Sequence, residues 1–192
     1  MLTITRKKDN RVVKCILHRI ADIPGGVGVS VANLGGAVLH EGTPIGLGSN
    51  GLYKVVKTAK LYATATGSDT TLKVVKGHHF AAGDYITSGN NNGQLIVSID
   101  KSNAEYDTIT VQTTIGASLS TGACMTETTG VNKTAAVAPV AIVGESYDVI
   151  PGENLFVNAW VIGVVKESVA PVVNDTIKSA LKGVIFVYSF NS

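Results

Sequence analysis

The stretches LIVSID (residues 95–100) and TITVQTTI (residues 108–115) decide the fold class of this chain. In the second stretch Ile109 and Val111 alternate with polar residues, and in the first we expect Leu95, Val97 and Ile99 to share the inward face. Such alternation is typical of a β-strand with one buried face. Because this pattern outweighs helical periodicity along the chain, the sequence predicts an all-β protein.

Turn residues separate the predicted strands. Asn50-Gly51 suits a type I′ hairpin, and the segments 67–69 and 89–93 are rich in Gly, Asn, Ser and Asp. Hairpins join antiparallel strands, so we expect a small antiparallel barrel or sandwich, similar to a β-tulip. One short helix is expected over residues 174–183, with Asn174 as its N-cap, Ile177 and Leu181 on one face and Gly183 at its end.

A spaced pattern of Gly and apolar residues occurs three times. It reads Gly-x-x-apolar-x-x-Gly-x-x-apolar, in Gly36, Leu39, Gly42, Ile45; in Gly77, Phe80, Gly83, Ile86; and in Gly116, Leu119, Gly122, Met125. We interpret each copy as a barrel corner, in which an apolar residue lies under the sheet, a Gly turns the chain and a strand begins.

Charge is low and unevenly distributed. Only 16% of the residues are charged, where a freely soluble chain usually has about a quarter. We infer that part of the surface faces protein neighbours. The first 20 residues carry six basic residues and one acid, so their net charge is +5: Arg6, Lys7, Lys8, Arg11, Lys14 and Arg19 against Asp9.

We interpret residues 1–23 as a basic docking arm for an acidic surface, joined by the Gly-rich segment 25–28 to a single β domain over residues 24–192. That domain could consist of two sub-lobes, 24–135 and 136–192. A strand of the body is the alternative for the arm, because Val12, Cys15 and Leu17, or Val13, Ile16 and Ile20, could point inward.

Two apolar runs near the C-terminus predict an oligomer. Residues 155–165 and 184–190 offer more apolar surface than a small sheet readily hides, and a terminus of this composition is expected to pair into a sheet. We therefore expect an obligate oligomer, with an interface built on Trp160, Phe156, Phe186, Tyr188 and Phe190.

Catalytic and metal-binding patterns are weak. His78 and His79 are adjacent, so on an extended chain they face opposite sides, and we expect surface or turn roles for both. Glu105 and Asp107 are interpreted as a solvated strand edge. The Gly25–Ser30 segment lacks the spacing of a phosphate-binding loop. Our hypothesis is a protein that is not an enzyme and has no cofactor and no metal.

The targeting and cysteine patterns of the sequence point to no specific location or binding site. The first residues lack the apolar stretch of a secretory signal, and the longest apolar run is too short to cross a bilayer. Cys15 and Cys124 have no zinc or redox spacing, so we expect two unpaired buried thiols. We expect neither a membrane nor a nucleic acid as a partner, because aromatic and basic residues are not interleaved.

Three stretches carry a resemblance to a known class of proteins. Residues 37–46 read AVLHEGTPIG, residues 51–57 read GLYKVVK and residues 77–86 read GHHFAAGDYI. Their sequences resemble those of head decoration and head fibre proteins of tailed phages, including phages of Bacteroidales and crAss-like phages. The resemblance covers about residues 24–165. The resemblance implies a homotrimer on the capsid exterior of the virion, bound to the major capsid protein, assembled in the host cytoplasm and possessing no catalytic residues.

Other functions stay open at this point. A tail or baseplate β module would have the same composition, and position in the particle would distinguish it from a capsid protein. A carbohydrate-binding adhesin module would be expected to expose several aromatic residues on one face. The capsid-binding hypothesis accounts together for the low charge, the apolar C-terminal segment and the basic segment.

Overall fold

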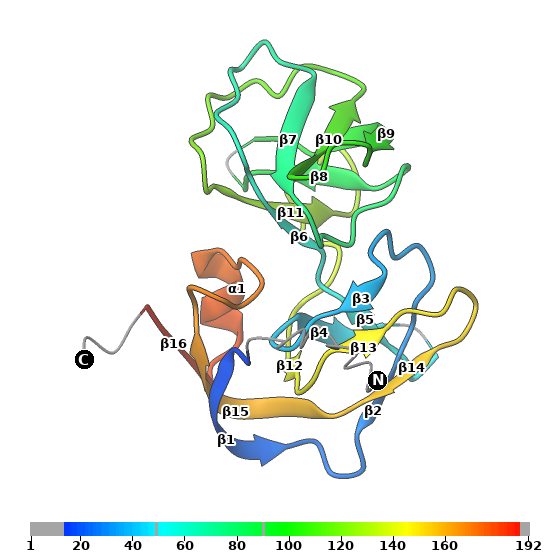
Figure 1. Ribbon diagram of the computed structural model, residues 1–192, viewed down its shortest axis with the longest axis vertical. Coiled ribbons are helices and arrows are strands. Elements are labelled where there is room, and N and C mark those ends of the chain that lie inside the picture. Colours follow the sequence, from blue (N-terminus) through cyan, green and yellow to red (C-terminus); the bar gives the residue numbers. More distant parts are fainter. Residues whose placement is uncertain (1–13, 49, 90, 189–192) are drawn as a thin grey trace, which may run out of the picture.

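The computed structural model describes residues 14–48, 50–89 and 91–188. It is an all-β structure with curled antiparallel sheets and one short helix near the C-terminus, which confirms the predicted fold class. The strands form an eight-stranded, a six-stranded and a two-stranded sheet. Figure 1 shows two bodies, one above the other, with the helix at the side of the lower one.

The eight-stranded sheet forms the lower body, which we call the basal barrel. Its strand order is β1-β15-β12-β4-β5-β2-β14, with β16 paired in parallel to β15. The strands are β1 (Ile16–Asp22), β2 (Val27–Val29), β4 (Pro44–Leu47), β5 (Tyr53–Val55), β12 (Ala141–Val143), β14 (Leu155–Val157), β15 (Ala159–Lys166) and β16 (Val184–Val187).

This sheet closes on itself. Only Asn158 separates β14 from β15, so the path from β15 through β12, β4, β5 and β2 returns to the same stretch of chain. The inside holds a cluster of small and branched apolar residues: Val27, Val29, Leu39, Ile45, Val55, Ala141, Val143, Val157 and Ala159. Closure removes most of the free sheet edges, and side chains of this size fill the interior of a small barrel.

The six-stranded sheet forms the upper body, which we call the inserted barrel. Its order is β6-β11-β8-β9-β10-β7, and a bridge between Leu61 and Val74 joins the two ends. The strands are β6 (Thr58–Lys60), β7 (Thr71–Val75), β8 (Tyr85–Thr87), β9 (Gln94–Asp100), β10 (Tyr106–Val111) and β11 (Cys124–Thr128). The remaining two strands, β3 (Val38–Leu39) and β13 (Tyr147–Asp148), pair with each other as a two-stranded sheet.

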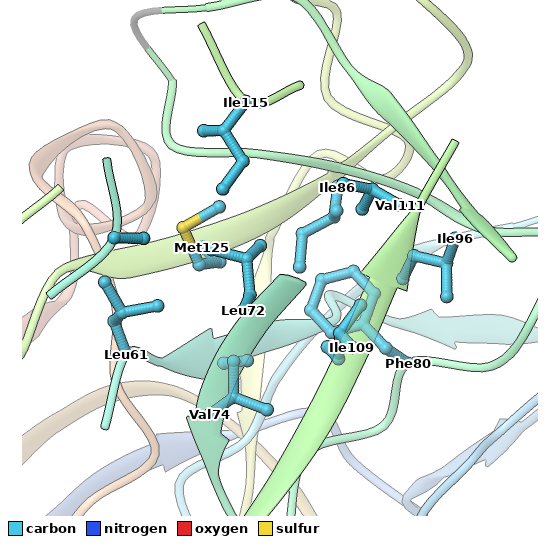
Figure 2. Packing of buried hydrophobic residues seen from close by; sticks show 12 residues of the cluster. Leu61, Leu72, Val74, Phe80, Ile86, Ile96, Ile109, Val111, Ile115 and Met125 are labelled. Carbon is cyan, nitrogen blue, oxygen red and sulfur yellow. The ribbon is translucent and has the colours of Figure 1, made fainter. Parts of the chain in front are cut away.

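The core of the inserted barrel is separate from that of the basal barrel. Figure 2 shows Leu72, Ile109 and Phe80 among the side chains that meet in its interior. Phe80 and Ile109 are fully buried, and burial of each large apolar side chain contributes about 1.5–3 kcal/mol. The inserted barrel therefore has its own source of stability.

The order of strands along the chain changes the predicted division into sub-lobes. The inserted barrel, residues 58–128, lies between β5 and β12 of the basal barrel, so basal strands come from both ends of the chain. The predicted sub-lobes 24–135 and 136–192 do not match this arrangement. Composition is uniform across residue 57, and only long-range strand pairing shows that β5 and β12 belong to one sheet.

The N-terminal boundary also changes. Residues from Ile16 to Asp22 form β1 and pair with β15, with Ile16 opposite Val165 and Asp22 opposite Trp160. Cys15 and Ile16 are buried, whereas Leu17 and Ile20 are exposed. An independent arm ending at residue 23 is therefore wrong for residues 15–22, and the strand alternative holds for them.

Strand β9 is buried on a different face from the one predicted. Ile96 is buried and Val97 is more than half exposed, the reverse of the expected alternation. The cause is a bulge: Thr110 of β10 lies opposite Ser98, the next residue Val111 lies opposite Ile96, and Val97 is left without a partner. One extra residue on a strand moves the following side chains to the other face.

The Gly pattern forms corners as predicted. Gly42, Gly83 and Gly122 have positive φ angles of 81°, 94° and 87°. Each is followed by an N–H that donates to the carbonyl three residues earlier, and then by a strand. Because only Gly adopts this backbone region without strain, the repeated Gly positions fix where the strands begin.

The predicted helix is present and shorter than expected. Helix α1 spans Asp175–Ala180, and the side-chain oxygen of Asn174 accepts a hydrogen bond from the Ile177 N–H at 2.9 Å. Ile177 and Leu181 are buried in a cluster that also contains Cys15, Val165 and Val184. The helix thus covers the side of the basal barrel formed by β15 and β16.

Candidate functional site

A cleft of about 680 Å³ lies where the two barrels meet. The basal barrel contributes His40, Glu41 and Glu167 to its lining, and the inserted barrel contributes Lys76, His78 and His79, among other residues. The cleft therefore collects titratable side chains that are far apart in the sequence.

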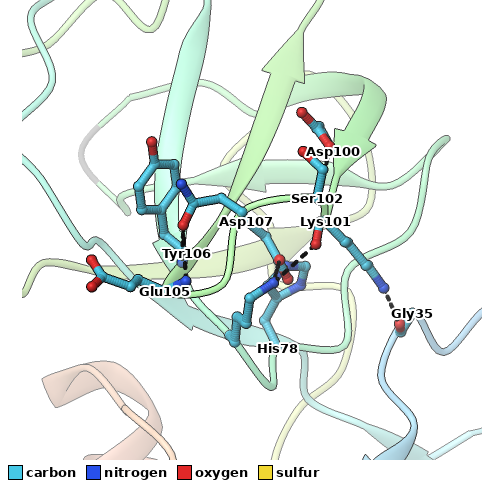
Figure 3. Close-up of polar contacts among 10 residues, drawn as sticks. Gly35, His78, Asp100, Lys101, Ser102, Glu105, Tyr106 and Asp107 are labelled. Carbon is cyan, nitrogen blue, oxygen red and sulfur yellow. Dashed lines mark hydrogen bonds and ion pairs between the residues drawn. The ribbon is translucent and has the colours of Figure 1, made fainter.

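His78 is held in one orientation. Its Nδ1 accepts a hydrogen bond from the Phe80 N–H at 3.2 Å, so the neutral ring carries its proton on Nε2. Nε2 lies 3.3 Å from Asp107 Oδ2, without the alignment of a hydrogen bond, and the other carboxylate oxygen accepts from Lys76 Nζ at 2.5 Å. Figure 3 shows this group beside Lys101. Burial lowers the pKa of His78 more than Asp107 raises it.

His79 is buried among positive groups. Burial lowers its pKa to about 4, and the charges of His40, His78, Lys57 and Lys101 act in the same direction. Its Nδ1 has no hydrogen-bond partner among the described residues. Both histidines are 5% exposed, so the predicted surface role is wrong; they lie in the loop that follows the bend after β7.

The predicted solvated edge at Glu105 and Asp107 is only half right. Glu105 accepts a hydrogen bond from the Tyr62 hydroxyl at 2.8 Å in an exposed position. Asp107, however, is buried beneath Lys76 and His78. Strand alternation placed both carboxylates on one face, but it could not show that the chain around Gly77 folds back over Asp107.

A second polar cluster joins the barrels behind the cleft. Lys57, at the entry to the inserted barrel, is buried, and its Nζ lies 2.6 Å from Asp84 Oδ2 and 3.5 Å from Glu127 Oε1. The same Nζ donates to the Asn33 carbonyl of the basal barrel at 2.8 Å. Burial raises the pKa of Glu127, and the charge of Lys57 opposes that rise. Sequence reasoning missed this cluster because its members are far apart along the chain.

A loop of the basal barrel lies directly against the inserted barrel. The Gly35 N–H donates to the His79 carbonyl at 2.9 Å, and Lys101 Nζ donates to the Gly35 carbonyl (Figure 3). A Cβ atom at Gly35 would lie 1.8 Å from the Phe80 carbonyl oxygen. Only Gly fits where the two backbones approach so closely, so a larger residue at position 35 would displace the loop from the inserted barrel.

Polar contacts between the two barrels include those of the Gly35 loop and of Lys57. The described histidines, cysteines and carboxylates include no group of three or more that could bind a metal ion. His78 Nδ1 is committed to the Phe80 N–H and Asp107 to Lys76. Both contacts lie within the inserted barrel and fix the positions of His78 and Asp107 there.

The predicted docking residues have different environments. Lys14 is exposed just before β1. Arg19 is engaged within the body: its Nη2 lies 3.0 Å from Glu41 Oε1 and 2.7 Å from the Gly144 carbonyl, and its guanidinium lies over Trp160. Arg6, Lys7, Lys8 and Arg11 lie outside the described residues. Arg19 is therefore not a free docking residue.

The predicted interface residues also divide. Phe156 and Tyr188 are 68% and 76% exposed. Trp160 and Phe186 pack partly buried against the cluster beneath α1, so they stabilise the chain itself. Phe190 lies outside the described residues.

Further exposed apolar residues lie on the outer side of β1, β15 and β16. Val164 of β15 is paired with Ile185 of β16 and with His18 of β1. Ile185, Ile162 and Leu17 are 58%, 40% and 46% exposed. We call Leu17, Ile162, Val164 and Ile185 the outer patch. Ile162, Val164 and Ile185 belong to the apolar runs 155–165 and 184–190 that the sequence predicted to be in excess, whereas bulges in β1 hide the alternation of Leu17.

The two cysteines are free thiols. Cys15 is buried, and burial raises its pKa to about 12. Cys124 borders the cleft and is partly exposed, and burial raises its pKa also to about 12. A thiol with so high a pKa is a poor nucleophile at neutral pH.

In the described part of the chain, no helix is long and apolar enough to span a membrane. Comparison with models of protein families, with curated proteins and with solved structures finds no match.

Proposed function

We propose that this protein is a structural component of a tailed-phage particle, and that it decorates the capsid exterior as a homotrimer bound to the major capsid protein. The sequence resemblance over residues 24–165 supports this role. The all-β fold, built of two small closed barrels, suits a protein whose task is to present a surface.

The observation that carries the proposal is the outer patch. Ile185 is paired directly with the half-buried Val164, and Ile162 lies two residues before Val164 on the same strand face, so these residues are not scattered singly. Contiguous exposed apolar residues mark sites of protein–protein contact. The chain has only 16% charged residues, and contact with neighbouring subunits or with the capsid would remove this apolar surface from water.

The basic residues add a second contact. Five of the six basic residues in the first 20 positions, all except Arg19, precede β1 in the sequence. Strand β1 carries Leu17 of the outer patch, and the exposed Lys14 lies just before this strand. Charge near an apolar contact steers association and adds a salt-sensitive affinity.

Removal of this charge is expected to weaken capsid binding without unfolding the protein. The variant changes Arg6, Lys7, Lys8, Arg11 and Lys14 together to Ser. Exposed ion pairs contribute about 0.2–1 kcal/mol each, so five together contribute about 1–5 kcal/mol and their loss should weaken binding by roughly fivefold to a few thousandfold. Co-sedimentation with empty capsids of the phage that produces the protein measures the affinity, and the melting temperature should barely move.

The matched control removes five exposed charges elsewhere: Lys54, Lys60, Lys73, Lys133 and Lys182 to Ser. This control should bind capsids nearly as tightly as the unchanged protein. Equal loss in both variants would show that only net charge matters. Unchanged saturation of capsids by the first variant, at the same concentration and salt, would contradict the docking role of residues 6–14.

A further inference from the structure

The contact between the two barrels depends on the position of His79. The Gly35 N–H donates to the His79 carbonyl, and a Cβ atom at Gly36 would lie 2.8 Å from the His79 Nδ1 atom. The imidazole is thus enclosed between its own barrel and the loop of the basal barrel. The imidazole also borders the cleft, but its close approach to Gly36 means that a change at this ring affects the contact.

Neither histidine can be charged favourably in this position. A protonated imidazole has two N–H donors, and both need acceptors when buried. His79 Nδ1 has no acceptor, and His78 Nδ1 already faces the Phe80 N–H, which is itself a donor. Protonation would therefore place an unsatisfied donor, or two opposed donors, inside the contact.

The surrounding carboxylates are already paired with other cations. Asp107 is paired with Lys76, Glu41 with Arg19, and Glu167 with Lys178, and Asp84 and Glu127 both face Lys57. His40, Lys60 and Lys101 add positive or titratable groups around the two histidines. A positive charge on His79 thus meets repulsion with little compensation, whereas for His78 the attraction of Asp107 at 3.3 Å offsets only part of the cost of burial.

We propose that the contact between the barrels is an acid-sensitive joint, closed while His78 and His79 are neutral and loosened when they are protonated, with each barrel remaining folded. Each barrel has its own closed sheet and its own apolar core, so loosening the joint need not unfold either. This property is independent of the capsid role.

The direction of the pH effect follows from the lowered pKa values of these bases. A base with a lower pKa in the closed state stabilises that state fully above its ordinary pKa of 6.5. The contribution is lost as the pH falls from about 6.5 towards the pKa of about 4 of His79. The joint should therefore loosen within this window and close again on neutralisation.

Amide hydrogen exchange tests the joint in the full-length protein. The Gly35 amide, bonded to the His79 carbonyl, reports on the joint; the Val111 amide, bonded to Thr70, reports on the inserted barrel; and the Val143 amide, bonded to Thr43, reports on the basal barrel. After correction for intrinsic exchange, Gly35 should lose protection about tenfold or more between about pH 7.5 and about pH 4. Val111 and Val143 should retain theirs.

Two variants separate the histidines from other acid effects. In His79→Gln that side chain cannot be protonated and only His78 still can, so the loss of Gly35 protection across this window should be clearly smaller than in the unchanged protein. In the control His18→Gln, which changes an exposed histidine on β1, Gly35 should behave as in the unchanged protein. If His79→Gln does not fold, the pH dependence of exchange at the three amides of the unchanged protein still tests the proposal. Constant Gly35 protection, or equal loss at all three amides, would overturn the proposal.

Discussion

Replacement of Lys57 with Met is expected to destabilise the protein by about 3–5 kcal/mol, the usual cost of removing one partner from a buried ion pair. Lys57 is 5% exposed and is the shared partner of Asp84 and Glu127. Its loss would leave two carboxylates close together in a poorly hydrated site and the Asn33 carbonyl without its donor. Met retains most of the volume, so the effect reports on charge more than on packing.

Denaturant unfolding at neutral pH measures this loss. The matched control is Lys54→Met, which removes an exposed Lys only three residues earlier, on β5, and should change stability by about 0.5 kcal/mol or less. Similar small losses in both variants would show that the Lys57 cluster does not stabilise the joined barrels.

Deletion of residues 1–22 is expected to prevent folding, whereas deletion of residues 1–13 should leave the melting temperature nearly unchanged. The longer deletion removes β1, together with the buried Cys15 and Ile16. It also removes two hydrogen bonds, from Lys166 N–H to the Cys15 carbonyl and from the Cys15 N–H to Glu41. Loss of an integral strand exposes the cluster beneath α1 to water.

Far-ultraviolet circular dichroism and thermal unfolding of the two truncated proteins measure this difference. The shorter truncation serves as the control, since it keeps the strand and removes four of the six basic residues. A folded, cooperative 23–192 fragment would contradict the role of β1 in the basal barrel.

Local patterns predicted the elements of this fold well. Alternation predicted the strands, the repeated Gly predicted the corners at Gly42, Gly83 and Gly122, and Asn174 predicted the start of the helix. These features depend on neighbours within a few residues, which the sequence shows directly. The Val97 bulge escaped prediction because an unpaired residue is visible only when its partner strand is known.

Long-range arrangement could not be predicted in the same way. The insertion of one barrel between β5 and β12 depends on pairing between strands more than 80 residues apart. The polar groups at the joint could not be predicted for the same reason, because their members are far apart in the sequence. Lys57, Asp84 and Glu127 each look like ordinary surface charges in the sequence, as do His78, His79 and Asp107. Arg19 likewise looked free until β1 brought it next to Glu41.

Imaging of phage capsids with and without the protein tests the proposed capsid role most directly. Empty capsids of the phage that produces the protein would be mixed with the purified full-length chain and compared by electron cryomicroscopy. We expect additional threefold-symmetric density on the outer capsid surface, with the basal barrel and its outer patch buried in contacts. Capsids without additional density at saturating protein, or labelling of the tail or baseplate alone, would contradict it.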